Sequence, residues 1–422
     1  MVFKLIKISF SRLLQHTKNH MGSLYWLTIA QIINFISLFT LSIFLGNFID
    51  KTTYGEYKYI LSAASVLFVF SISGFNMVIP RLVNNGQTSI VNQAFKSTVL
   101  SSLIGSFIAV ILSTYYFISH NPILFVSFFI ISISIPLFNA FQLYVPYLTG
   151  LKDYKRIALY GFFPDIFAAI STIIVSVYAP HTLMLICTYF FSNIFSHGLM
   201  YLITIQKFPP QILLKKNKEE EKIAINLSLI NIVSALANNI DKFLIFHLLG
   251  STSLAIISFA QAFPNQIKAI QKNIVPISVA KFSKDKGTGI NLKKISSSVL
   301  FINLFVILLY VLTANTLFNL FFPNYSESIN FSKIISLSLF FVPINYIIQT
   351  YLQINARIRI LYKVNLLTYI IQILIGIILI LQWKMFGAII YITITPILQT
   401  VIGYIGYRQE RKLNFLQNNI IT

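Results

Sequence analysis

Five polar residues recur at helical spacing in an apolar stretch of the chain. They are Ser258, Gln261, Asn265, Lys268 and Lys272, spaced three, four, three and four residues apart. At 100° per residue, this spacing places them on one face of a helix. Amides and compact ammonium groups on one face suit a ligand that combines hydroxyl groups with phosphate. The alternative is that the lysines, Lys272 above all, extend along the helix to reach water and bind nothing.

A second apolar stretch carries an adjacent acid and base. Its polar residues are Asn231, Ser234, Asn238 and Asp241, again three or four residues apart, and Lys242 follows directly. Consecutive helical residues do not face each other, so Asp241 and Lys242 should not form a self-contained ion pair. At least one of them should contact another helix or water. We predict that Asn238 and Lys242 bind ligand, and that Asp241 either couples an ion or belongs to a structural pair.

Two further charged residues each follow a proline. Asp165 follows Pro164 inside an apolar run, and Arg81 follows Pro80 at the end of another. A carboxylate in such a run is a candidate for carrying a proton or ion, or else a packing partner for a lysine. Arg81 is a candidate for ligand binding, although an arginine at the end of an apolar helix also fits a purely topological role.

No pattern in the chain indicates catalysis. There is no cluster with metal-ligand spacing, phosphate-binding glycine loop or nucleophile motif, and His197 and His247 are isolated, which favours structural roles. The single cysteine, Cys187, excludes a disulfide within the chain and a cysteine-based metal site. We expect neither an enzyme nor a resident metal or cofactor.

The composition identifies the solvent around these residues. Of 422 residues, 56% are hydrophobic and 10% are charged, and the deficit of charge extends along the whole chain. We therefore predict an all-α polytopic membrane protein with about twelve transmembrane helices. The expected spans are 24–48, 58–80, 95–118, 122–149, 156–178, 182–206, 223–249, 252–277, 295–321, 333–356, 361–382 and 385–407. Several prolines fall in or near these spans and suggest kinks, which neighbouring helices can accommodate.

The basic residues set the predicted orientation. Most of the 32 Lys and Arg residues fall in alternate connections, which become cytoplasmic if both termini are cytoplasmic. This bias accounts for the net charge of +21 without a nucleic-acid partner. Residues 1–20 alternate apolar and basic positions at helical spacing, which predicts an amphipathic helix on the inner leaflet or, alternatively, a frayed basic tail.

The chain divides into two predicted lobes. A cytoplasmic linker, 207–222, separates an N-lobe over 21–206 from a C-lobe over 223–408, and 409–422 forms a cytoplasmic tail. The dipeptides Leu45-Gly46 and Leu249-Gly250 stand at equivalent places in the two lobes. Six helices in each lobe give parallel repeats, and folds of this kind place their substrate site between the halves.

The chain resembles a known family, the Wzx-type polysaccharide flippases of the multidrug/oligosaccharidyl-lipid/polysaccharide (MOP) exporter superfamily. Three stretches carry the resemblance: LGNFIDKTTYGEYKYILSAASVLFVFSISGFNMVIPRLV at 45–83, NNIDKFLIFHLLGSTSLAIISFAQAF at 238–263, and LFFPNYSESINFSKIISLS at 320–338. The order and spacing of these three stretches, rather than any one motif, make the resemblance specific. One departure is Ala255-Ile256, where a glycine-tyrosine step like that of the first lobe would be expected.

The resemblance implies a MATE-like, V-shaped transporter of the bacterial inner membrane with a central cavity. Its substrate would be an undecaprenyl-diphosphate-linked oligosaccharide repeat unit, moved outward by alternating access for O-antigen, capsule or a related glycan. Lys268, Lys272, Gln261, Asn265, Asn238, Lys242 and Arg81 would then line the cavity, with Asp165 and Asp241 as ion-coupling candidates.

Other members of that superfamily leave alternatives open. Coupling to H⁺ or Na⁺ fits as well as transport without an ion. Membrane lipids, a polysaccharide polymerase and a chain-length regulator are the expected partners. The competing functions are a cation-coupled multidrug exporter of the same superfamily and a membrane polysaccharide polymerase. The short outer connections disfavour the polymerase, because such enzymes usually carry a sizeable outer loop.

Overall fold

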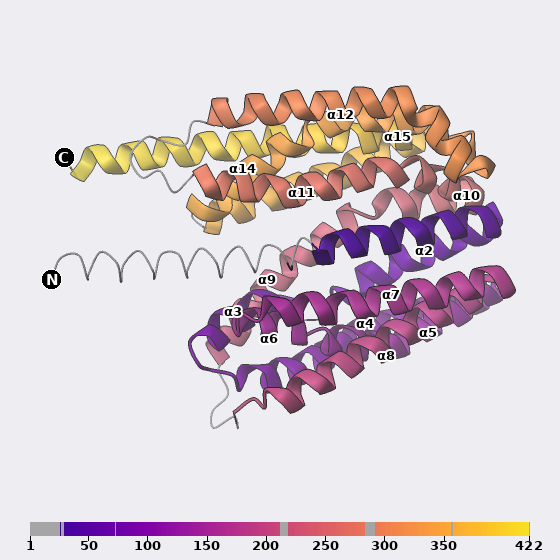
Figure 1. The fold of residues 1–422 in the computed structure, drawn as a ribbon, viewed down its shortest axis with the longest axis horizontal. Coiled ribbons are helices and arrows are strands. Elements are labelled where there is room, and N and C mark those ends of the chain that lie inside the picture. Colours follow the sequence, from indigo (N-terminus) through magenta and orange to yellow (C-terminus); the bar gives the residue numbers. More distant parts are fainter. Residues whose placement is uncertain are drawn as a thin grey trace. The chain divides into compact units, whose positions relative to one another are not determined.

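The structure is a computed structural model that describes residue 26 and residues 29–71, 73–211, 218–282, 292–355 and 358–421. Within these ranges the secondary structure is helical, without a strand. The predicted amphipathic helix over 1–20 and the middle of the predicted linker lie outside the described residues. Figure 1 shows the order of the elements.

The chain forms two compact units. The first comprises Met1–Phe44 and Leu67–Ser228, and the second comprises Leu45–Val66 and Leu229–Thr422. Residues 45–66, which the sequence placed in the N-lobe, thus belong to the second unit. The rest of each predicted lobe, 21–206 and 223–408, falls mainly in one unit.

The first unit is built around paired helices. It contains the helix Ile29–Phe48 up to Phe44, then α3 (Phe75–Asn84), α4 (Ile90–Ile118), α5 (Pro122–Phe141), α6 (Tyr144–Gly150), α7 (Tyr154–Tyr178), α8 (Thr182–Lys207) and the start of α9 (Lys218–Ala237). The helices α4, α5, α8 and α7 pack in succession, and α3 packs against α6. Buried Phe75, Ile79, Tyr144 and Tyr147 join α3 to α6 in one apolar cluster.

The second unit combines most of α2 with the remaining helices. These are α2 (Lys51–Phe68), α10 (Ile240–Ala260), α11 (Ala262–Phe282), α12 (Leu292–Phe321), η1 (Pro323–Tyr325), α13 (Ser328–Leu337), η2 (Ser338–Phe340), α14 (Val342–Asn355) and α15 (Ile358–Ile421). The helix α15 packs against α10 and α14, and α11 packs against α14. The polar side chains of interest lie on α2, α10 and α11.

Each predicted span has a helical counterpart. In the described ranges, nine stretches are long and apolar enough to cross a membrane. One of them, Ile360–Glu410, is interrupted at Lys384, where φ is 48°, and therefore covers two of the predicted spans. The spans predicted at 58–80 and 252–277 correspond to shorter helices joined at breaks, α2 with α3 and the end of α10 with α11. The predicted all-α polytopic fold is confirmed.

Close helix approaches hold each unit together. A Cβ added to Gly55 would lie 1.9 Å from the carbonyl oxygen of Ser251, and one added to Gly74 would lie 2.1 Å from that of Ala224. The first contact brings α2 against α10 in the second unit, and the second brings α3 against α9 in the first. Glycine is required at both sites because any side chain would collide with backbone.

Candidate functional site

Three lysines and one acid gather in the second unit. The charges of Lys242, Lys272 and Asp241 all act on the ammonium group of Lys268. Lys242 and Lys268 are half-buried, Lys272 is exposed, and Asp241 is buried. The structure therefore brings together four of the predicted site residues, two from α10 and two from α11. We call Lys242, Lys268 and Lys272 the lysine face.

The acid and base of α10 do form an ion pair, but not a self-contained one. Lys242 Nζ lies 3.7 Å from Asp241 Oδ1. The same ammonium group donates to the backbone oxygen of Asn238 at 3.1 Å and to Asn239 Oδ1 at 3.2 Å. Asp241 also acts electrostatically on Tyr391 of α15, as it does on Lys268. The ammonium group of Lys242 thus has partners besides Asp241.

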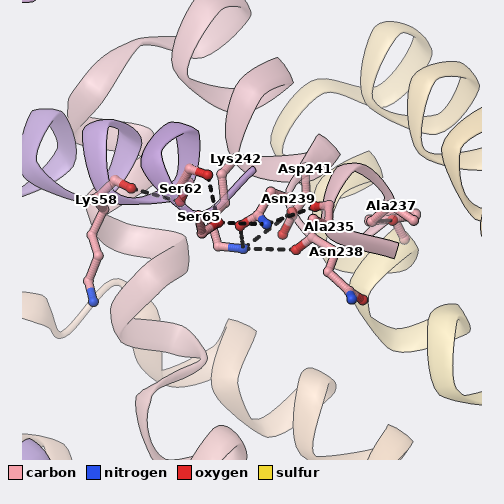
Figure 2. A network of polar contacts seen from close by, with 10 residues as sticks. Lys58, Ser62, Ser65, Ala235, Ala237, Asn238, Asn239, Asp241 and Lys242 are labelled. Atoms are coloured by element: carbon pink, nitrogen blue, oxygen red, sulfur yellow. Dashed lines mark hydrogen bonds and ion pairs between the residues drawn. The ribbon is translucent and has the colours of Figure 1, made fainter. Parts of the chain in front are cut away.

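Asn239 joins this pair to α2. Its amide nitrogen donates to Ser65 Oγ at 3.1 Å and to the backbone oxygen of Ala235 at 2.8 Å. Figure 2 shows the resulting network, in which hydrogen bonds continue from Ser65 through Ser62 to the backbone of Lys58. The hydroxyl of Ser65 and the amide of Asn239 therefore hold α2 and α10 in register beside Lys242.

The prediction of one continuous helix over 223–249 was wrong. The helix α9 ends at Ala237 and α10 begins at Ile240, so a break falls at Asn238 and Asn239. Groups from other helices stabilise the break: Tyr391 Oη donates to the backbone oxygen of Ala237 at 2.9 Å, and Ser65 binds the Asn239 amide. The spacing still places Ser234 and Asn238 on one face, since the Asn238 amide donates to Ser234 Oγ at 3.2 Å, but the break separates both from Asp241.

A smaller break divides the second polar stripe. The helix α10 ends at Ala260 and α11 begins at Ala262, with Gln261 between them. Ser258 therefore lies on a different helix from Asn265, whereas Lys268 and Lys272 remain one turn apart on α11. Gln261 is half-buried and Asn265 is exposed. Their predicted contact with ligand remains a prediction.

The other two candidates lie in the first unit. Asp165 on α7 accepts a hydrogen bond of 2.5 Å from Asn34 Nδ2 and acts electrostatically on Tyr144 and Tyr189. Its observed partner is thus a neutral amide rather than a lysine. Arg81 on α3 pairs with Glu220 on α9, and 55% of its side chain is exposed.

The histidines have structural neighbours. His197 Nδ1 lies 3.3 Å from Tyr144 Oη, and His247 Nε2 lies 3.1 Å from Tyr59 Oη. Across the described ranges, no group of three or more His, Cys, Asp or Glu residues is arranged to hold a metal ion. These contacts fit the structural roles that their isolation in the sequence favoured.

Sequence reasoning missed the contribution of α2. Lys58, Ser62 and Ser65 stand at positions i, i+4 and i+7, which makes a polar stripe on an apolar helix. This spacing could have predicted a polar face on α2. The hydrogen bond between Ser65 and Asn239 could not have been predicted, because it joins residues far apart in the chain.

Comparison with known proteins is consistent with a membrane transporter fold. The structure is similar to the "Lipid II flippase MurJ, inward closed conformation", with a TM-score of 0.67 and 13% identity, covering 92% of this chain and 87% of that one. It is also similar to a MOP superfamily transporter from Pyrococcus furiosus, described as having a binding pocket of reverse polarity, with a TM-score of 0.55 and 13% identity over 92% and 95% of the two chains. An inward-facing multidrug resistance MATE transporter gives a TM-score of 0.56 at 13% identity over 94% and 99%.

The family follows from the sequence match. Residues 22–282 match the family of polysaccharide biosynthesis proteins, which is more than half of the chain. The chain belongs to this family, and it is a multi-pass membrane protein with the fold of the transporters compared above. No curated protein matches the chain.

Proposed function

We propose that the protein is a flippase for an undecaprenyl-diphosphate-linked oligosaccharide repeat unit, which it moves from the cytoplasmic to the outer face of the inner membrane by alternating access. The lysine face is the observation that supports this substrate, together with the family and the likeness to a lipid II flippase. A glycan linked through a diphosphate is anionic near its lipid and rich in hydroxyl groups beyond it. Lysine ammonium groups suit the former, and amides suit the latter.

The electrostatic balance supports an anionic cargo. Asp241 is the one acid among the charges that act on Lys268, against two other lysines. An unneutralised positive charge inside a membrane protein is costly, so it is retained where a counter-ion or substrate binds. The diphosphate would supply that counter-charge, and Lys268 and Lys242 would hold it. Asn238, Asn265 and Gln261 would contact sugar hydroxyl groups, and Lys272 would lie nearer the membrane surface.

An ion gradient is the proposed driving force. Asp241 is buried, its Oδ1 atom has no hydrogen-bond partner among the described residues, and Asp165 shares one hydrogen bond with Asn34. A carboxylate in this setting changes its interactions when it takes up a proton or Na⁺. We propose Asp241 and Asp165 as the coupling groups. The membrane lipids, a glycan polymerase and a chain-length regulator are the proposed partners.

The alternative is a cation-coupled drug exporter, which the MATE-type structural neighbours represent. The lysine face disfavours it, because an ammonium-rich surface repels a cationic drug. A transporter of either kind performs no covalent chemistry, so we propose no enzymatic activity.

Gene deletion tests the proposed function. Cells without the protein should lose surface polysaccharide and accumulate the lipid-linked precursor on the cytoplasmic face. Complementation with native protein should restore display, whereas Lys268→Ala at matched expression should not. A deletion strain with normal polysaccharide and raised sensitivity to cationic dyes would contradict the flippase and favour the exporter.

A further inference from the structure

Lys58 is a lysine of the second unit that the proposed diphosphate contact does not use. It lies in the second turn of α2, seven residues after Lys51, which corresponds to about 10 Å along the helix. Lys51 marks the start of α2 and pairs with Glu327 at 3.2 Å. The two lysines therefore differ in depth, and of the two only Lys51 has an acidic partner among the described residues.

The ammonium group of Lys58 is incompletely satisfied. It lies 5.3 Å from the ring centroid of Tyr54, a cation–π contact that uses none of its three N–H donors. Within the described ranges it has neither an acidic partner nor a hydrogen-bond acceptor. A half-buried ammonium group with three free donors needs water or an anionic ligand.

Lys58 is joined to the lysine face by a continuous polar path. Ser62 Oγ donates to the Lys58 backbone oxygen at 2.7 Å, and Ser65 Oγ donates to the Ser62 backbone oxygen at 2.7 Å. Ser65 then accepts from Asn239, which accepts from Lys242. Because Lys58 and Ser65 are seven residues apart, about 10 Å of helix separates Lys58 from the Asn239 contact.

The side-chain directions agree with a shared face. Figure 2 shows Lys58 extending away from the Ser62–Ser65 path, and in that view the exposed side chain of Asn238 extends the same way. Both residues belong to the second unit. In the same view Ser65 lies between Lys242 and Lys58, so an extended ligand bound at Lys242 could continue past Ser65 toward Lys58.

We propose that Lys58 is a specificity-determining residue that binds a carboxylate on the glycan part of the substrate. This inference rests on the proposed function, which places the diphosphate at Lys242 and Lys268. The helix rise of about 10 Å between Lys58 and Ser65, which contacts Asn239 beside Lys242, is longer than the two phosphates of one diphosphate and fits sugar rings beyond them. The substrate class is thus a lipid-linked oligosaccharide that carries an acidic sugar close to its reducing end.

Binding of two matched probes tests the inference. The probes are polyprenyl-diphosphate-linked disaccharides that end in glucuronic acid or in glucose, titrated against the purified full chain in nanodiscs. The native protein should bind the acidic probe about tenfold more tightly, the effect of one hydrogen-bonded charge. Lys58→Met should abolish this preference without weakening the neutral probe, and Lys58→Arg should keep it.

A matched control separates Lys58 from a general effect of charge. Lys51→Met removes a lysine of the same helix that is already paired, and it should leave the preference unchanged. A preference that survives in Lys58→Met, or is absent from the native protein, would overturn the inference. Failure of Lys268→Gln to weaken either probe would instead overturn the proposed function, so the two failures are distinguishable.

Discussion

The candidate charges of the first unit and those of the second are accommodated in opposite ways. In the first unit, Asp165 has the amide of Asn34 and Arg81 has the carboxylate of Glu220. In the described part of the second unit, Lys242 pairs with Asp241, the same carboxylate acts on Lys268, and Lys272 adds a further positive charge. The backbone contacts of the two units are alike, since a glycine brings two helices together in each. Close packing at glycine is thus common to both units, whereas the candidate lysines that could bind an anion lie in the second.

The largest effect is expected from the shared packing. Gly55→Ala and Gly74→Ala each place a Cβ within 2.1 Å of a backbone oxygen, so helices must separate and unfolding should become easier by about 1–3 kcal/mol. Gly161→Ala is the control, because no described atom beyond its own stretch of helix lies within 4 Å of the added Cβ. The fraction of protein that remains monodisperse after heating in detergent measures the effect. Equal stability in all three variants would show that the packing is looser than the structure indicates.

The second-largest effect is expected from removing the positive charge of the lysine face. Replacing Lys242, Lys268 and Lys272 together with glutamine should abolish display of surface glycan because the substrate loses its counter-charge. Thermal stability should fall as well, because the buried Asp241 loses its partner, so display is compared at matched amounts of folded protein. Lys96→Gln in the first unit is the control, since this exposed lysine should be dispensable. Immunoblotting at matched expression and quantification of surface polysaccharide give the readout. Normal display of surface glycan by the triple variant would contradict a role of the lysine face in substrate binding.

The two aspartates should respond to neutralisation with different signs. Asp241→Asn removes the shared counter-charge of the lysines, so thermal stability should fall by an amount typical of a broken buried pair. Asp165→Asn keeps an acceptor for the Asn34 amide and removes a costly charge, so stability should hold or rise. Thermal unfolding of both variants in detergent compares them. A larger loss for Asp165→Asn would reverse the contrast between the units.

The smallest effect is expected at Arg81. Its ion pair with Glu220 is half-exposed, and such pairs contribute about 0–1 kcal/mol. Arg81→Gln and Glu220→Gln should therefore keep glycan display within about twofold of the native level, in keeping with that small free energy. A loss as deep as that of the lysine variant would place Arg81 in substrate binding, as its position in the sequence first suggested.

The membrane spans could be predicted because hydropathy acts locally. Each expected span has its helix, and the interruption at Lys384 falls between the last two of them. The break at Asn238 and Asn239 could not be predicted, since it depends on Ser65 and Tyr391 from distant segments. Asparagine pairs occur within helices as well as at their ends, and here the contacts with Ser65 and Tyr391 determine that the helix breaks.

The site was predictable in part for the same reason. The spacing of Lys268 and Lys272 is local, and the structure retains it on α11. That Lys242 and Asp241 act on Lys268 depends on how α10 and α11 pack, which no window of sequence contains. The assignment of residues 45–66 to the second unit was also beyond local pattern, and with it the place of Lys58.

Translocation by purified protein tests the central claim most directly. Native protein in liposomes should expose a fluorescent undecaprenyl-diphosphate-linked disaccharide to a reductant outside the vesicles, beyond the half accessible in protein-free vesicles. The variant with Lys242, Lys268 and Lys272 replaced by glutamine should leave the inner half protected, and Lys96→Gln should behave as native. Equal translocation by native and lysine-free protein would contradict the account.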